Sequence, residues 1–147
     1  MRLKSLVFAV AAGCLGLSVA VAQEEPQALR QSQMKAVGGA IGALGGIAKG
    51  QKPYEAAAVT AALTTISTTM KAFPNQFPEG SQTGSESEAA PAIWQNKTDF
   101  EAKAQKLAAE ADSLLAAVPV DAAGVGAAMR ALGGTCSDCH QTYRMKK

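Results

Sequence analysis

The residues best suited to chemistry lie together near the C-terminus, in the run Cys136-Ser137-Asp138-Cys139-His140. If this run is helical, Cys136 and Cys139 are three residues apart and both sulfur atoms leave the same helix face. The imidazole of His140, four residues after Cys136, points from that face as well. Two thiols able to form thioether bonds, followed by an imidazole able to ligate iron, make up the C-x-x-C-H attachment sequence of c-type haem. The run therefore predicts one covalently bound haem c, with His140 as the proximal iron ligand.

Other uses of two cysteines and a histidine fit the sequence less well. A thioredoxin-like redox pair requires a βαβ context, whereas the periodicity of this chain is helical. A structural zinc site normally has four ligands, but His140 is the only histidine, and both nearby cysteines lie within the same five residues. A simple disulfide between Cys136 and Cys139 leaves the adjacent histidine without a role. Haem attachment uses all three residues.

Length and composition restrict the remaining possibilities. The chain has 147 residues, with 14 Lys and Arg, 12 Asp and Glu, 48% hydrophobic residues and 5% aromatic residues. This length suits a single domain, and the composition is too apolar for a disordered chain. Its positive charge is too low for binding a nucleic-acid backbone. Alternating runs of β-branched residues are scarce, which disfavours an all-β fold.

The N-terminus has the pattern of a secretory signal peptide. Arg2 and Lys4 precede an uncharged stretch over residues 6–22. The stretch ends in Ala20-Val21-Ala22, the small-x-small pattern that signal peptidase recognises. We therefore expect residues 1–22 to be removed during export, which predicts a periplasmic protein.

The expected mature domain, residues 23–147, is electrically neutral. Loss of the two basic residues in the leader leaves 12 basic residues against 12 acidic ones. A retained membrane anchor is the alternative to cleavage. Its apolar stretch, the 18 residues 5–22, is borderline against the roughly 20 needed to cross a bilayer, and the cleavage pattern favours removal. We expect no stable membrane insertion after cleavage.

Apolar residues of the mature chain recur at alternating steps of three and four, the period of an amphipathic helix. Four stretches share this pattern, bounded by Pro, Gly or a capping Asp: residues 26–50, 54–74, 91–119 and 121–143. Short joins after the first and third stretches predict antiparallel neighbours. The fold class is therefore an all-α, antiparallel four-helix bundle with one covalently bound haem. Residues 74–91 form either a crossover connection or a mobile surface loop.

The first helical stretch is unusually rich in glycine, with Gly38, Gly39, Gly42, Gly45 and Gly46. Each glycine costs about 1 kcal/mol of helix propensity relative to alanine. Two explanations stay open. The small residues allow either close packing between helices or space for a flat ligand.

These features together resemble the class II c-type cytochromes, the family of cytochrome c′. The resemblance covers nearly the whole mature chain and includes several short segments: Arg30-Gln31 before Met34, the corner at residues 49–54, Ile93-Trp94, residues 136–144, and a basic ending at residues 143–147. Class I cytochromes c differ, because their haem motif lies near the N-terminus and their ligand methionine follows far downstream. Here only seven residues follow His140.

The sixth position on the iron decides between two functions. No second histidine exists, and Met129 and Met145 lie on the helix of His140. By resemblance, Met34 occupies the position of the axial methionine in low-spin, cytochrome c-556-like members. Five-coordinate cytochromes c′ carry an apolar or non-ligating residue there, and Met34 also fits the apolar core repeat. Ligation by Met34 predicts an electron carrier that serves redox partner proteins. An open position predicts binding of nitric oxide or carbon monoxide.

Enzymatic activity is not expected. Catalysis at the iron requires a proton donor beside the distal position, and nothing near Met34 obviously supplies one except Arg30, one turn earlier. Two alternatives to proton donation stay open for Arg30: its side chain either pairs with a haem propionate or remains solvated. The resemblance to the cytochrome c′ family also implies that the protein can form a homodimer.

Overall fold

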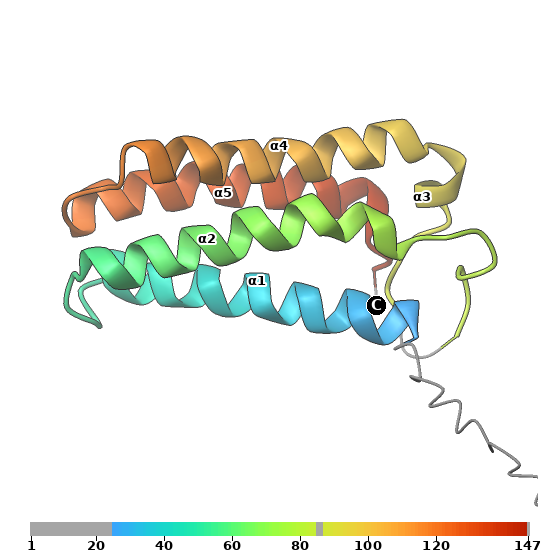
Figure 1. Cartoon of the computed structure of the whole chain (residues 1–147), viewed down its shortest axis with the longest axis horizontal. Helices are drawn as coiled ribbons and strands as arrows, with labels where there is room; N and C mark the ends of the chain where they lie inside the picture. Colours follow the sequence, from blue (N-terminus) through green and yellow to red (C-terminus); the bar gives the residue numbers. More distant parts are fainter. Residues whose placement is uncertain (1–24, 85–86, 147) are drawn as a thin grey trace, which may run out of the picture.

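The computed structural model describes residues 25–84 and 87–146, and the predicted signal peptide lies outside these ranges. Four long helices lie side by side in an up-down-up-down bundle (Figure 1). They are α1 (Pro26–Ala48), α2 (Ala56–Ala72), α4 (Lys97–Ala116) and α5 (Ala122–Tyr143). A 3-10 turn, η1 (Phe73–Gln76), and a one-turn helix, α3 (Ala92–Gln95), lie between α2 and α4. The predicted all-α, antiparallel four-helix bundle is confirmed.

The ends of the long helices follow the local signals in the sequence. Pro26 is the first residue of α1, a position where its missing N–H is not needed. Gly50, just after α1, takes the left-handed conformation with φ +67° and donates its N–H to the carbonyl of Ile47. The carboxylate of Asp121 accepts the N–H of Gly124 at 2.7 Å, and so caps α5 as predicted.

The third predicted helical stretch is divided by Asn96. Its backbone, with φ −138° and ψ 59°, leaves the helical region between α3 and α4. The interruption lets α3 pack separately at the end of the bundle, where Ile93 is buried. The indole Nε1 of Trp94 donates to the carbonyl of Pro78 at 3.1 Å. The apolar repeat of this stretch begins at Phe100, after the break, and so could not reveal it.

Aromatic residues are concentrated at one end of the bundle. Five of the six aromatic residues in the predicted mature chain gather there, in edge-to-face or tilted ring contacts: Phe73, Phe77, Trp94, Phe100 and Tyr143. Phe77 is central, with its ring centroid 5.0 Å from that of Phe73 and 4.7 Å from that of Phe100. At the opposite end, the Tyr54 hydroxyl joins the two short connections by donating to the carbonyl of Pro119 at 2.8 Å.

The connection between α2 and α3, described for residues 77–84 and 87–91, stays at one end of the bundle (Figure 1). It joins two adjacent antiparallel helices, so it is not a crossover that spans the bundle. Side chains from α1 and α4 hold it in place. Gln27 Nε2 donates to the carbonyl of Thr83 at 2.7 Å, and Lys97 Nζ donates to the carbonyl of Phe77 at 2.6 Å. Among the described residues, this connection is anchored rather than a free surface loop.

Replacement of Phe77 by Ala is expected to destabilise the holoprotein strongly. The ring is only 2% exposed, and its loss leaves a cavity among the other aromatic rings, at a cost of about 3–5 kcal/mol. Denaturant-induced unfolding measures the change. The control is Val120→Ala at a residue that is 80% exposed, with an expected change within about 0.5 kcal/mol. Equal small effects in both variants would contradict a core role for Phe77.

Candidate functional site

A cavity of about 680 Å³ lies between α1 and α5 at the aromatic end of the bundle. This volume is within the range of roughly 300–1,000 Å³ that is typical of ligand and cofactor sites. Four predicted site residues line it together: Cys136, Cys139 and His140 from α5, and Met34 from α1. The structure therefore brings the predicted residues into one site, with the methionine on a different helix from the C-x-x-C-H motif.

The α1 side of the cavity is formed by small and apolar residues. Met34 and Ile41 are partly buried, and Gly38 lies between them on the cavity wall. A Cβ atom added at Gly38 would meet no atom within 4 Å. Close packing of helices therefore does not explain Gly38. Its missing side chain leaves space in the cavity, which favours the ligand explanation at this position.

The two cysteines on the α5 side are half-buried free thiols. Burial, as the largest cause, raises the pKa of Cys139 to about 11, and it also raises the pKa of Cys136. Both thiols are therefore protonated at neutral pH. Reactive redox cysteines instead have lowered pKa values, so this environment does not suit a dithiol redox pair.

His140 lies at the boundary between the cavity and a second groove of about 600 Å³. Burial lowers the pKa of its imidazole, the positive charge of Arg144 lowers it further, and the negative charge of Glu88 acts in the opposite direction. The neutral imidazole is the form that ligates a metal.

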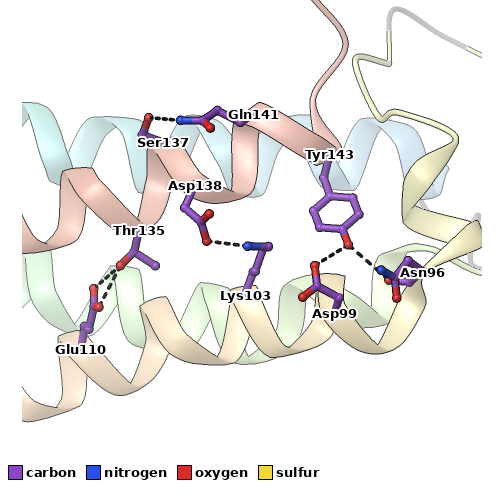
Figure 2. A network of polar contacts seen from close by, with 9 residues as sticks. All are labelled: Asn96, Asp99, Lys103, Glu110, Thr135, Ser137, Asp138, Gln141 and Tyr143. Carbon is purple, nitrogen blue, oxygen red and sulfur yellow. Dashed lines mark hydrogen bonds and ion pairs between the residues drawn. The ribbon is translucent and has the colours of Figure 1, made fainter.

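Polar contacts between α4 and α5 hold the helix that carries the motif (Figure 2). The hydroxyl of Thr135, next to Cys136, donates to the Glu110 carboxylate, with both oxygen atoms at 2.8 Å. Asp138, inside the motif, accepts from Lys103 Nζ at 2.5 Å. That bond to Lys103 lowers the pKa of Asp138, and the same bond raises the pKa of Lys103.

A third contact lies beyond the motif, at the end of α5. The hydroxyl of Tyr143 donates to a carboxylate oxygen of Asp99 at 2.6 Å (Figure 2). The partners Asp99, Lys103 and Glu110 follow each other along α4. Sequence reasoning missed all three, because no local pattern shows which helix faces α5.

Arg30 has a role that its sequence position did not reveal. It is only 4% exposed, and its Nε and Nη1 donate to the carbonyls of Gln76 at 2.6 Å and Ser81 at 3.0 Å. Nη2 donates to the Ser81 hydroxyl. The guanidinium also lies over the Phe77 ring, 4.3 Å from its centroid. Burial lowers the pKa of Arg30. Arg30 therefore anchors the α2–α3 connection while it also lines the cavity.

The fold and the cavity together define a four-helix bundle with a C-x-x-C-H site facing its interior. The family model for cytochrome c′ matches residues 25–144. The chain belongs to the cytochrome c′ family, and its cofactor is haem c. Within the described residues, no helix combines the length and the apolar run needed to cross a membrane.

Individual relatives agree with this assignment. Cytochrome c-556 of Agrobacterium fabrum is 55% identical over 147 residues, which covers all of this chain and 99% of the relative. Cytochrome c-556 of Agrobacterium tumefaciens strain II Chrys is 63% identical over 118 residues, covering 80% of this chain and 95% of the relative.

Solved structures show the same fold. Cytochrome c′ of Rhodopseudomonas palustris superposes with a TM-score of 0.79 at 32% identity, covering 85% of this chain and 99% of that one. Oxidised cytochrome c556 of the same organism gives a TM-score of 0.76, also at 32% identity and with the same coverage.

Replacement of Thr135 by Val is expected to destabilise the protein by about 1.5–3 kcal/mol, because a partly buried hydrogen bond to a charged carboxylate is lost. The matched control is Thr68→Val, where an exposed hydroxyl bonds only to carbonyls of its own helix. Denaturant unfolding of both holoproteins measures the difference. A Thr135→Val variant no less stable than the Thr68→Val variant would show that the Glu110 contact does not hold α5.

Proposed function

We propose that the protein is a periplasmic c-type cytochrome that binds one haem covalently and transfers single electrons between redox partner proteins. Cys136 and Cys139 form the covalent attachments, His140 is the proximal iron ligand, and Met34 is the distal iron ligand. One observation carries the proposal. Met34 from α1 lines the same cavity as the three motif residues from α5.

The residues around the cavity suit haem in charge as well as in size. Four basic residues line it against one acidic residue: Arg30, Lys35, Lys103 and Arg144 against Glu88. A cationic lining favours a ligand that carries carboxylates, as haem does in its propionates. When bound, haem c supplies an iron that accepts and releases one electron.

Electron transfer is favoured by the two axial side chains. Met34 and His140 line one cavity from different helices, and they would be the two side chains that hold the iron of a bound haem. A His and Met ligand pair raises the reduction potential of haem iron. Four relatives whose matches cover at least 80% of this chain carry the name cytochrome c-556. The family resemblance implies a methionine ligand in that subgroup.

Binding of small gases is the alternative function. One solved neighbour is the nitric oxide complex of a mutant cytochrome c′ from Alcaligenes xylosoxidans, with a TM-score of 0.70 at 29% identity. Gly38 leaves open space one turn from Met34, so a small molecule has room beside the methionine. In this alternative, Met34 is a core residue and the iron is five-coordinate.

We further propose that the protein is not an enzyme. Arg30, the basic residue one turn from Met34, has its guanidinium committed to Gln76 and Ser81 of the α2–α3 connection. The carboxylate of Glu88 is ion-paired with Arg144. Neither group is placed as a free proton donor at the distal position, which supports electron transfer without catalysis.

Export to the periplasm and assembly belong to the same proposal. The signal-peptide pattern of residues 1–22 supports export, and the match to the Agrobacterium fabrum cytochrome extends over the whole chain. Membership of the cytochrome c′ family supports a homodimer.

The Met34→Ala holoprotein is expected to change from low spin to high spin, and its ferrous form is expected to bind carbon monoxide readily. The wild-type protein should remain low spin, with a methionine–iron charge-transfer band when oxidised. Optical spectra with and without carbon monoxide measure both properties. The control is Met129→Ala, which removes a methionine that does not line the cavity. A high-spin wild-type spectrum would favour the gas-binding alternative, and a spectrum that the Met34→Ala change leaves intact would exclude Met34 as an iron ligand.

Loss of either sulfur should weaken attachment, and loss of both should abolish it. When the protein is exported in a host that attaches haem c, the intact mass should include one haem. The Cys136→Ala/Cys139→Ala variant should have the mass of the polypeptide alone, because no thioether can form. Denaturing mass spectrometry distinguishes covalent from non-covalent haem. A wild-type mass without haem would refute the proposed attachment.

A further inference from the structure

The end of α5 is joined to the α2–α3 connection by a short antiparallel bridge. Ala89 pairs with Arg144 in an isolated β-bridge. The N–H of Ala90 donates to the carbonyl of Tyr143 at 3.0 Å, and the N–H of Met145 donates to the carbonyl of Glu88 at 2.8 Å. These backbone contacts fix the connection beside the last turn of the helix that carries the haem motif.

The same two segments also form an ion pair. The Nε and Nη2 atoms of Arg144 both lie 2.6 Å from one carboxylate oxygen of Glu88. The Glu88 side chain is 27% exposed and the Arg144 side chain is 54% exposed. The Glu88 carboxylate is therefore partly shielded from solvent, whereas the Arg144 guanidinium is exposed, so added salt screens the pair.

The ion pair lies close to His140. Glu88, Arg144 and His140 together line both the main cavity and the adjacent groove. The two charges also act in opposite directions on the pKa of the imidazole, which Arg144 lowers and Glu88 raises. The two opposite charges therefore lie beside the proposed iron ligand, on the wall of the cavity that would hold the haem.

We propose that Glu88 is a positioning residue whose carboxylate balances the charge of Arg144 beside the haem site and so sets the reduction potential of the iron. This inference rests on the proposed function, in which His140 ligates a haem that changes oxidation state. Reduction adds one electron to the site. An unbalanced positive charge nearby favours the reduced state, and an unbalanced negative charge favours the oxidised state.

The balance matters because the cavity is otherwise cationic. The other charged side chains that line it are Arg30, Lys35 and Lys103, and Glu88 is the only acidic residue among the described lining residues. Lys103 already has a carboxylate partner in Asp138. Loss of the Glu88 charge therefore leaves Arg144 without its carboxylate partner and adds to the excess of positive charge around the cavity.

The test measures midpoint potentials of four holoproteins at low ionic strength and fixed pH: wild type, Glu88→Gln, Arg144→Gln and the double variant. Glu88→Gln should raise the equilibrium constant for reduction several-fold, and Arg144→Gln should lower it. A tenfold change corresponds to 59 mV for one electron. The double variant should return close to wild type, and added salt should reduce both single shifts.

A remote ion pair provides the matched control. Asp112 pairs with Lys71 at 2.7 Å, and neither residue lines the cavity. Asp112→Asn removes one carboxylate, as Glu88→Gln does, and should leave the midpoint potential unchanged. Amide exchange at Ala90 and Met145 shows whether the backbone bridge survives in each variant.

The double variant separates charge balance from a purely structural role. If the pair only held the chain in place, losing both side chains would disturb the potential at least as much as losing one. Such a result, or equal midpoint potentials in all four proteins, would overturn the inference about Glu88. The proposed electron-transfer function would still stand. A wild-type haem that cannot be cycled between oxidation states would instead refute the proposed function.

Discussion

The orientation of α5 is the constraint on which the rest of the structure depends. Two sulfur atoms and one imidazole must leave a single helix face toward the cavity, so a small rotation of α5 would displace all three. The adjacent face of the same helix carries Thr135 and Asp138, which bind Glu110 and Lys103 on α4. Within residues 135–140, the three motif residues that line the cavity are therefore interspersed with the residues that anchor α5 to α4, and the two sets lie on neighbouring faces of the helix.

The cavity also depends on an uneven distribution of side-chain size. Large aromatic rings close the end of the bundle, whereas Gly38 leaves the α1 wall open. The buried guanidinium of Arg30 links these features, since it contacts the Phe77 ring and bonds to the α2–α3 connection. Burial of a cation is costly unless its donors are satisfied, and here backbone carbonyls and an aromatic face satisfy it. Arg30 of α1 consequently helps to hold both the connection and the aromatic end.

Local patterns in the sequence predicted what local physics determines. The helical period, the Asp121 cap and the Gly50 stop required only neighbouring residues, and C-x-x-C-H identified three residues that the structure brings to one cavity. The break at Asn96 was not predicted, because the apolar repeat of that stretch begins only at Phe100 and carries no information on the residues before it. The partners of Arg30 and Arg144 lie 46 to 56 residues away in the chain, and no periodicity encodes such pairings.

The neutral charge of the predicted mature chain concealed a local asymmetry that the fold creates. Helix packing collects basic residues from α1, α4 and the end of α5 around one cavity, and the α2–α3 connection brings Glu88 to it. Excess positive charge suits an anionic cofactor, but each extra cation also favours the reduced iron. The positive charge that helps to hold the haem propionates therefore also shifts the equilibrium between oxidised and reduced iron. A carboxylate beside Arg144 lets the site keep a cationic lining while limiting that second effect, which gives the long connection an electrostatic role as well as a structural one.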